Sequence, residues 1–384
     1  MKILHTSDWH LGQSLYNHDR TEEQAYMLGQ ITRIVREEQP DALLVSGDIF
    51  DTGQPSAAVQ RMFTDSLVSI HEACPAMTIV CTAGNHDSPS RHEIFRQPWL
   101  SLNVHSIGQL DKACPERHII RLPGLGYIIA VPYCYERNMP EGFFQRLLDL
   151  VAEENNDHLP VVMMAHTTME NSDLRGHKAG GQVAIGGIET TTISQVGHGY
   201  DYLALGHIHH AQWVKGTDKR ARYSGSPLQT SFDEDYDHSV SLVNIPRHGS
   251  EASLRTISIP PIRPLVTLPA NGYAEWEEAR EMLADFPDDH PAYIRLNITS
   301  GSILPPNAFD EAKMLTQDKE CRFCIINREH VDTSDIAATT LSISELKQMS
   351  PLDIARQYAE QRGCTFDDEI IKLFNQATQS ASEE

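Results

Sequence analysis

The sequence predicts an α/β protein with more than one domain, and three observations carry that prediction. Short apolar runs typical of strands alternate with amphipathic helical patterns through the first half of the chain. The 384 residues suffice for two or three domains at roughly 100–200 residues each. Hydrophobic residues make up 40% and charged residues 22%, an ordinary globular balance that argues against a disordered chain or a coiled coil.

The first half of the chain supplies most of the predicted elements. Helices are expected from Thr21 through Val35, where 21–24 has the form of a capping box, and over 57–70, 93–102 and 143–151. After residue 212 the helical pattern fades, and short strand patterns at 222–224 and 240–245 predict antiparallel strands in a mixed sheet. The earlier strands are expected at 3–5, 42–46, 77–82, 119–122, 127–131, 161–165 and 202–205.

A proline-rich stretch over 260–264 marks the predicted end of this first domain. Strands at 265–268, 292–298 and 322–327 then alternate with helices at 274–283 and 309–315, which predicts a small βαβαβ unit. Capping signals after Ser342, Ser350 and Thr365 predict two or three short helices that fold back on the body or dock on another protein. The predicted domains are therefore 1–260, 261–330 and 331–384.

Charge and cysteine content exclude several classes of protein. Asp and Glu number 53 against 31 Lys and Arg, so a net charge of −22 excludes nucleic-acid binding by bulk electrostatics alone. A nucleic-acid role would need metal ions, a local basic patch or a basic partner. Seven scattered cysteines without a signal peptide argue against a disulfide framework, and Cys321-x-x-Cys324 is interpreted as two core-facing thiols. No apolar run is long enough to span a membrane, and a cytoplasmic location is expected.

Metal-binding side chains follow five of the predicted strands. In open α/β sheets, ligands bind just beyond the carboxyl ends of strands. Each group alone would be interpreted as a turn, a loop or a hydrogen-bonded core residue, but five repeats of one placement indicate a site. The glycines before Asp48, Asn85 and His207 would let the chain turn tightly off its strand. The groups are Asp8 and His10, Asp48 and Asp51, Asn85 to Asp87, His166, and His207 with His209 and His210.

The ligand types indicate the kind of site. The set contains carboxylates, an amide oxygen and imidazoles, and no thiolates lie nearby. Such ligands suit a site for manganese, iron or zinc ions rather than a structural zinc centre. So many groups exceed the needs of one ion and suit two ions that share a carboxylate. Paired metals ~3.5–4 Å apart activate a water and clamp the oxygens of an in-line phosphoryl displacement.

In order and spacing these motifs resemble the calcineurin-like metallophosphoesterase pattern. The segments 7–12, 47–53 and 223–233 are similar to those of bacterial SbcD proteins, the nuclease subunits of SbcC–SbcD complexes, and the resemblance covers nearly the whole chain. It implies a four-layer α-β-β-α metallophosphoesterase sandwich with a small α/β capping domain and a helical C-terminal tail.

The resemblance also implies a role for each site residue. Two divalent metals, with Mn2+ favoured, would share Asp48. His86 would face the phosphate and stabilise the transition state or assist the leaving oxygen. Asp87 would orient His86 or another ligand. Asp51 receives no role, and only the family spacing prefers His209 to His210. The first metal would take Asp8, His10, Asp48 and His209, and the second Asp48, Asn85, His166 and His207.

The implied activity is DNA hydrolysis in end processing and repair. Relatives of this type act as 3′-to-5′ exonucleases on duplex ends and as endonucleases on single strands and hairpins. They form a homodimer within a heterotetramer with SbcC, an SMC-like ATPase; helices near 57–70 and 93–102 would mediate the dimer and the tail would dock on SbcC. The chain has no P-loop motif of its own. Two alternatives stay open: a phosphoesterase for small phosphoesters, and a scaffold without activity.

DNA contacts are hypothesised at two places. One is the basic cluster of Lys215, Lys219, Arg220 and Arg222, and the other is the Gly-rich segment 174–187. For each, a solvated surface loop is the slightly favoured interpretation.

Overall fold

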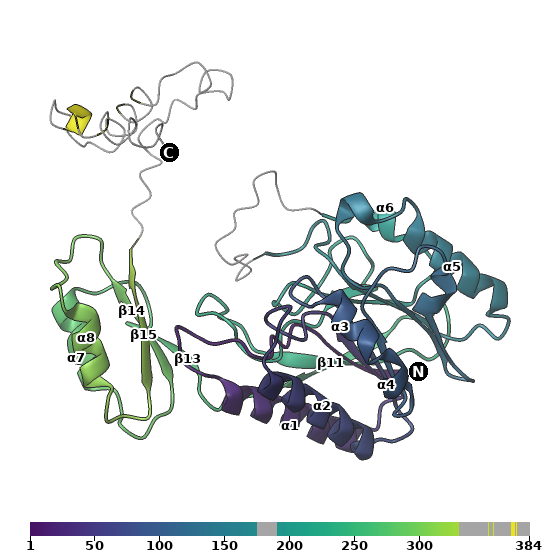
Figure 1. Cartoon of the computed structure of the whole chain (residues 1–384), viewed down its shortest axis with the longest axis horizontal. Helices are drawn as coiled ribbons and strands as arrows, with labels where there is room; N and C mark the ends of the chain where they lie inside the picture. Colours follow the sequence, from purple (N-terminus) through teal and green to yellow (C-terminus); the bar gives the residue numbers. More distant parts are fainter. Residues whose placement is uncertain (175–189, 330–351, 353–355, 357–369, 373, 375–384) are drawn as a thin grey trace.

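The computed structural model describes residues 1–174 and 190–329, together with 352, 356, 370–372 and 374 (Figure 1). Two six-stranded sheets and one three-stranded sheet form the framework of this described part. Apart from 352, 356, 370–372 and 374, the predicted C-terminal helices lie outside the described residues, as does the Gly-rich segment 174–187 beyond its first residue.

The first sheet has the order β12-β11-β1-β2-β3-β4. Four strands run parallel, namely β1 (Lys2–Thr6), β2 (Ala42–Ser46), β3 (Thr78–Thr82) and β4 (Val104–Ile107). The antiparallel strands β11 (Ser239–Asn244) and β12 (Ser253–Ser258) extend the sheet beyond β1. Helices α1 (Thr21–Glu38) and α2 (Ala57–Ala73) cover its outer face, where their apolar stripes share one core with it (Figure 1).

The second sheet has the order β5-β6-β7-β8-β10-β9. Its central strands β6 (Gly126–Ala130), β7 (Val161–His166), β8 (Tyr202–Gly206) and β10 (Ala221–Tyr223) are parallel. The edge strands β5 (Ile119–Leu122) and β9 (Gln212–Trp213) are antiparallel to their neighbours. Helix α5 (Phe143–Glu154) covers the outer face, with α6 (Ile193–Val196) beside it; short 3-10 turns lie at Pro115–His118 and Glu136–Asn138.

The two large sheets pack face to face through a common apolar layer. Ile3 and Leu44 of the first sheet meet Val162 and Met164 of the second in one cluster, and all four side chains are fully buried. These strands are apolar on both faces, because one face meets a helix and the other meets the opposite sheet. The helix-sheet-sheet-helix order confirms the predicted four-layer sandwich.

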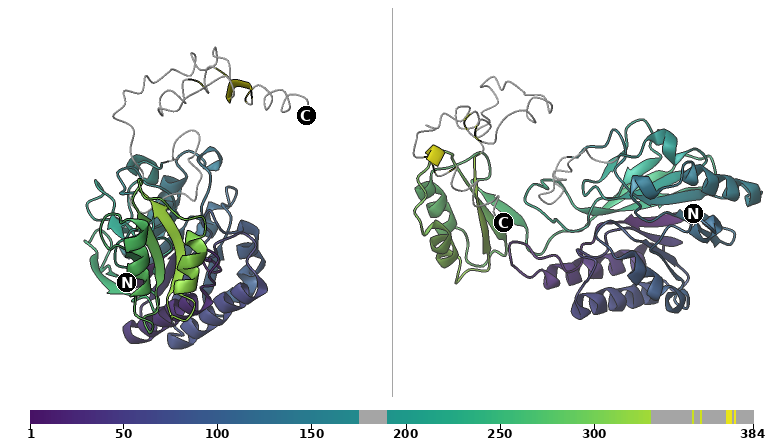
Figure 2. Two further views of the ribbon diagram at one scale, coloured as in Figure 1. Left: turned by 90° about the vertical axis from the view of Figure 1, so that its left-hand side faces the viewer. Right: turned by 45° about the horizontal axis from the view of Figure 1, so that its top comes forward.

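The third sheet stands at one end of this body (Figure 2). It contains β13 (Leu265–Leu268), β14 (Tyr293–Ile298) and β15 (Arg322–Arg328), all parallel, with α7 (Trp276–Ala284) and α8 (Ala308–Leu315) on the face away from the body (Figure 1). Alternate residues of β14 serve the two faces: Ile294 packs under the helices, whereas Tyr293 packs with Leu15 and Phe232 of the body. We call this unit the cap sheet. The domain limits at 260 and 330 stay predictions.

Two predictions about helices were wrong. The capping box at 21–24 does not form, because Arg20 is the N-cap of α1 and the Thr21 hydroxyl donates to Asp19 Oδ2 over 3.0 Å. The single helix expected over 93–102 is instead α3 (Pro89–Ile94) and α4 (Arg96–Leu100), which meet at Phe95. Pro98 lacks an N–H and is tolerated in the first turn of a helix, so it favours a fresh start over a continuous helix.

Two other features agree with the sequence analysis. Cys321 and Cys324 are buried in separate apolar clusters, as expected of core-facing thiols. Within the described ranges, no helix combines the length and the apolar character needed to cross a lipid bilayer.

The packing between the large sheets predicts a stability effect. Leu44→Ala removes a fully buried side chain from this layer and should lower the free energy of unfolding by about 2–5 kcal/mol. Leu125→Ala, the same change at a residue that is 41% exposed, should cost roughly 0.5 kcal/mol or less. Urea unfolding of both variants measures the difference, and equal losses would contradict the inter-sheet packing.

Candidate metal centre

The predicted site residues meet at one edge of the body, where the two large sheets present the carboxyl ends of their strands. Asp8 and Asp48 follow β1 and β2, and Asn85 follows β3 of the same sheet. His166 ends β7, and His207 follows β8 of the other sheet. The backbone N–H of Asp8 donates to the Gly47 carbonyl over 3.0 Å, which extends the strand pairing into the loops that carry the ligands.

Three side chains gather in the first half of the centre: Asp8, His10 and His209. The Nε2 atoms of the two imidazoles lie 3.2 Å apart, and the candidate ligand atoms of all three residues lie within 4.8 Å of one another. Both carboxylate oxygens of Asp8 also accept the backbone N–H of His207, at 3.0 and 3.1 Å. Asp8 therefore ties together loops that leave different sheets.

The second half brings together Asn85, His166 and His207. Asn85 Oδ1 lies 3.0 Å from His166 Nε2 and 2.9 Å from His207 Nδ1. His166 is held by its other nitrogen, which lies 2.8 Å from the Ser46 carbonyl oxygen. His207 thus turns Nδ1 toward the centre, whereas His166 turns Nε2.

Asp48 lies between the two halves and is almost fully buried. Its Oδ2 is 3.8 Å from His10 Nε2 on one side and 3.4 Å from His166 Nε2 on the other. The other oxygen, Oδ1, accepts the backbone N–H of His86 over 2.8 Å. The position of Asp48 is the one that a carboxylate shared by two cations requires.

The backbone is bent sharply around these ligands. Asp8, His10 and Asp48 have φ of 53°, 44° and 50°, and His207 has 100°, a region that non-glycine residues rarely adopt. Such conformations cluster at functional sites, where the surrounding structure holds them.

The glycines that precede the ligands have a second use. Gly47 has φ of 85° and supplies the turn that the sequence predicted. Gly84 and Gly206 instead make room, because a Cβ on Gly84 would collide with the Asp48 carboxylate and one on Gly206 with the Ser46 carbonyl. Gly84 therefore lets two loops of the first sheet pack closely, and Gly206 lets the two sheets approach each other.

Asp87 supports the loops and not the ring of His86. Its carboxylate accepts the backbone N–H groups of Ile49, Phe50 and Gly84 at 3.1, 2.9 and 2.8 Å. These bonds lock the loop of Asp48 to the loop of Asn85.

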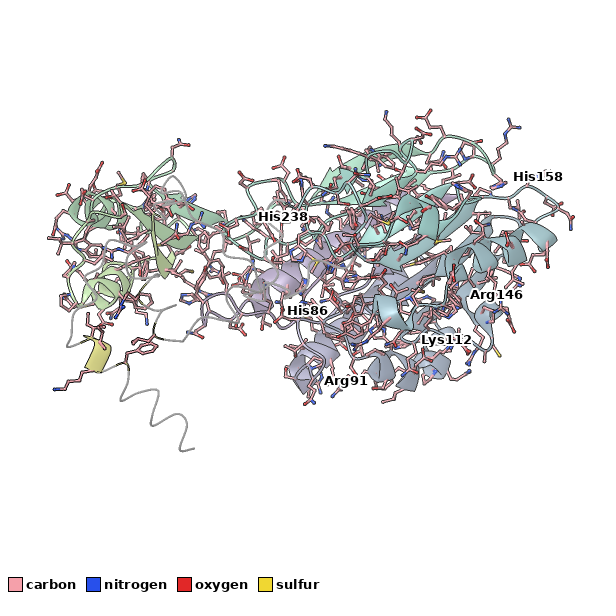
Figure 3. The ribbon with its side chains drawn as sticks, turned by 90° about the horizontal axis from the view of Figure 1, so that it is seen from above. His86, Arg91, Lys112, Arg146, His158 and His238 are labelled. Carbon is pink, nitrogen blue, oxygen red and sulfur yellow. The ribbon has the colours of Figure 1, made fainter. Side chains whose placement is uncertain are left out.

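His86 takes its orientation from Asp51. The Asp51 carbonyl oxygen lies 2.8 Å from His86 Nδ1, and the Asp51 carboxylate lies 3.4 Å from His10 Nδ1. The His86 ring packs edge-on against His10, with centroids 4.9 Å apart, yet His86 remains exposed. Figure 3 shows His86 on the part of the body nearer the cap sheet. The His86 ring is therefore accessible from the solvent.

The acceptor atoms of the site converge in a way that suits divalent cations. If His166 donates from Nδ1 to Ser46, its Nε2 carries a lone pair that faces oxygens of Asn85 and Asp48. Buried acceptors that converge without a donor repel one another unless a proton or a cation lies between them. Mixed oxygen and imidazole ligands suit divalent first-row metals.

The electrostatics of the site favour positive charge. Burial lowers the pKa of His166, but the charge and hydrogen bond of Asp48 and the charge of Asp8 outweigh burial and raise this pKa to about 9. Burial also lowers the pKa of His10, but the hydrogen bond with Asp51 and the charge of Asp48 outweigh burial and raise this pKa to about 9. Burial raises the pKa of Asp48, but the charges of His166 and His10 bring it below the usual range.

The structure separates His209 from its neighbour and adds one residue that the sequence analysis missed. His210 stacks on Tyr236, with ring centroids 4.5 Å apart, and is not among the clustered metal-binding groups of the described residues. Glu234 is buried and lies 2.7 Å from His209 Nδ1. Its position directly after the SbcD-like segment 223–233 was the only sequence signal for it.

Comparisons with known proteins identify the family of this chain. Residues 1–211 match the family model of calcineurin-like phosphoesterases. The SbcD subunit of the SbcCD nuclease from Rhodobacter capsulatus is 33% identical over 72% of this chain and 74% of its own length. The corresponding protein from Bacillus subtilis is 30% identical over 100% of this chain and 99% of its own. The one from Escherichia coli K12 is 28% identical over 79% of each.

A solved structure is also similar. A dimetal phosphatase from Danio rerio matches 67% of this chain and 98% of its own, with 13% sequence identity and a TM-score of 0.38.

The raised pKa values predict proton release when metal binds. Below pH 9 both His10 and His166 hold an extra proton, which a cation must displace because metal-bound imidazole is neutral. Apparent affinity for a divalent cation should therefore rise as pH increases from 6.5 toward 9, by about 10-fold per pH unit for each displaced proton, and then level off. Calorimetry in buffers of different ionisation enthalpy counts the protons. Affinity that does not change with pH, without proton release, would contradict this electrostatic account.

Proposed function

The chain belongs to the calcineurin-like phosphoesterase family and, within it, to the SbcD proteins, and from this premise we propose that it is a two-metal DNA nuclease. The observation that carries the proposal is the place of Asp48 between two clusters of metal-binding side chains. Divalent metals are the cofactors of this family, and Mn2+ is the proposed ion. The substrate class rests on relatives that are named as nucleases.

The proposed ligands form two sets, one for each cation. One cation would be held by Asp8, His10 and His209 with Asp48, and the other by Asn85, His166 and His207 with Asp48. Such a pair, when bound, supplies a nucleophilic water and Lewis-acid stabilisation of the phosphoryl oxygens.

His86 is the proposed catalytic residue. With Nδ1 engaged by the Asp51 carbonyl, the ring can present Nε2 to a phosphodiester held at the metals. In its protonated form it would donate a hydrogen bond to a developing oxyanion or a proton to the leaving oxygen.

The finer details of substrate and partner rest on the resemblance to SbcD proteins. We infer 3′-to-5′ exonuclease activity on duplex ends, endonuclease activity on single strands and hairpins, and action with an SbcC-type ATPase in DNA end processing and repair. The names of the relatives support a nuclease activity within an SbcCD complex. Exposed apolar side chains on the α3–α4 segment support the homodimer within a heterotetramer: Ile94 is 66%, Phe95 47% and Leu100 42% exposed.

One residue of the basic cluster at 215–222 is not available to contact DNA. Arg222 is buried, donates to the Ser241 hydroxyl over 3.1 Å and stacks on Trp213, so its role is structural. Lys215, Lys219 and Arg220 are exposed and remain the candidates.

Two variants separate metal binding from turnover. His86→Ala should still bind two Mn2+ per chain, because His86 is not a proposed ligand, but turnover of a hairpin DNA should fall by about 10²–10⁴-fold. Asp48→Ala should lose both metal and activity, since each cation needs this carboxylate. His198→Ala, at an exposed position ahead of β8, is the control and should behave as wild type.

The same assay decides the substrate class. Wild-type protein should cleave the hairpin far faster than bis-p-nitrophenyl phosphate at equal concentration. A preference for the small ester would favour the small-phosphoester alternative, and wild-type turnover in His86→Ala would refute the catalytic role.

A further inference from the structure

The loop between β10 and β11 carries a carboxylate directly behind a proposed metal ligand. Glu234 is 1% exposed, and its Oε1 lies 2.7 Å from His209 Nδ1. The opposite nitrogen of that ring, Nε2, is the one 3.2 Å from His10 Nε2. The ring of His209 therefore stands between Glu234 and the place of the first cation.

Glu234 is fixed by its own loop. The backbone N–H of Thr230 donates to Oε2 over 2.7 Å, and the Thr230 hydroxyl donates to Oε1. His238 Nε2 lies 3.6 Å from Oε2. A buried carboxylate is costly unless it is hydrogen-bonded or paired, and here each oxygen has partners. Its geometry is thus set before any cation binds.

The cap sheet holds the same loop from its other side. Arg295 of β14 lies with Nη1 3.0 Å from Asp233 Oδ1, and its guanidinium lies 5.1 Å from the centre of the Phe232 ring. Both residues immediately precede Glu234. The loop is consequently clamped between the metal centre and the cap sheet.

We propose that Glu234 is a positioning residue of the metal centre. It accepts the Nδ1–H of His209 and so selects the tautomer whose Nε2 lone pair points at the cation shared with Asp8 and His10. A carboxylate in this position fixes the direction of the imidazole and increases its basicity toward metal. The inference rests on the proposed two-metal function and names a residue outside the seven proposed ligands.

A purely structural role for Glu234 makes a different prediction. A loop anchor would change thermal stability and leave the affinity of the folded protein for metal unchanged. A positioning role changes that affinity in proportion to how well the replacement still accepts from Nδ1–H. The graded pair Glu234→Gln and Glu234→Ala distinguishes the two, because the Gln side chain keeps an acceptor oxygen without the charge, whereas Ala removes both.

The experiment measures Mn2+ binding to the full chain by calorimetry and by the EPR signal of free Mn2+, beside the Mn2+ dependence of hairpin cleavage. We expect one of two sites to weaken by about 10–100-fold in Glu234→Ala and by less in Glu234→Gln. The Mn2+ concentration for half-maximal cleavage should shift by the same factor, and excess Mn2+ should restore the rate. Asp235→Asn, the same charge change at an exposed neighbour, should leave both unaltered.

Three outcomes would count against the inference. Wild-type Mn2+ affinity in folded Glu234→Gln and Glu234→Ala would overturn it while the two-metal proposal stands. An equal loss of Mn2+ affinity in Asp235→Asn would mean that net charge alone causes the effect, and it would also overturn the inference. Wild-type protein that binds no Mn2+ would refute the proposed function itself, and the inference with it. If Glu234→Ala does not fold, the near-isosteric Glu234→Gln decides.

Discussion

The convergence of hydrogen-bond acceptors at a buried edge is the constraint on which the site depends. Asp48 stands at its centre, with imidazole nitrogens of His10 and His166 3.8 and 3.4 Å away. Such an arrangement is unfavourable unless positive charge fills it, which is why the protons of the metal-free state and the cations of the working state compete for one place. Gly84 and Gly206 have no Cβ and so leave room for the close packing at this edge. The Asp87 carboxylate accepts backbone N–H groups that join the surrounding loops.

Several arginines of this acidic chain make contacts inside the fold. Arg20, Arg263 and Arg322 surround the ring of Tyr293, each with its guanidinium 5.6–5.7 Å from the ring centre, where the cap sheet meets the body. Arg263 also pairs with the buried Glu23 over 2.6 Å. Arg222 is buried as well, so these four arginines have structural roles. On the proposed function, attraction for DNA phosphates would fall to the metals, to exposed residues such as Lys215 and Lys219 and to a basic partner.

Sequence patterns could predict most of the fold and which side chains cluster at the site, because strand periodicity and the chemistry of each side chain are local properties. Parallel strands bring their carboxyl ends to one edge, so Asp8, Asp48 and Asn85 could be expected together. The position of Glu234 behind His209 could not, since it depends on how the loop after β10 folds back. The choice between His209 and His210 was equally out of reach without a resemblance, because adjacent residues on a bent loop point in different directions. The failed capping box shows the same limit, as an Asp19 contact replaced it.

Anomalous X-ray scattering from crystals grown with Mn2+ tests whether two cations share Asp48. We expect two peaks per chain, about 3.5–4 Å apart, with the Asp48 carboxylate between them, His209 beside one and His207 beside the other. A single peak, or a pair of peaks away from Asp48, would contradict it.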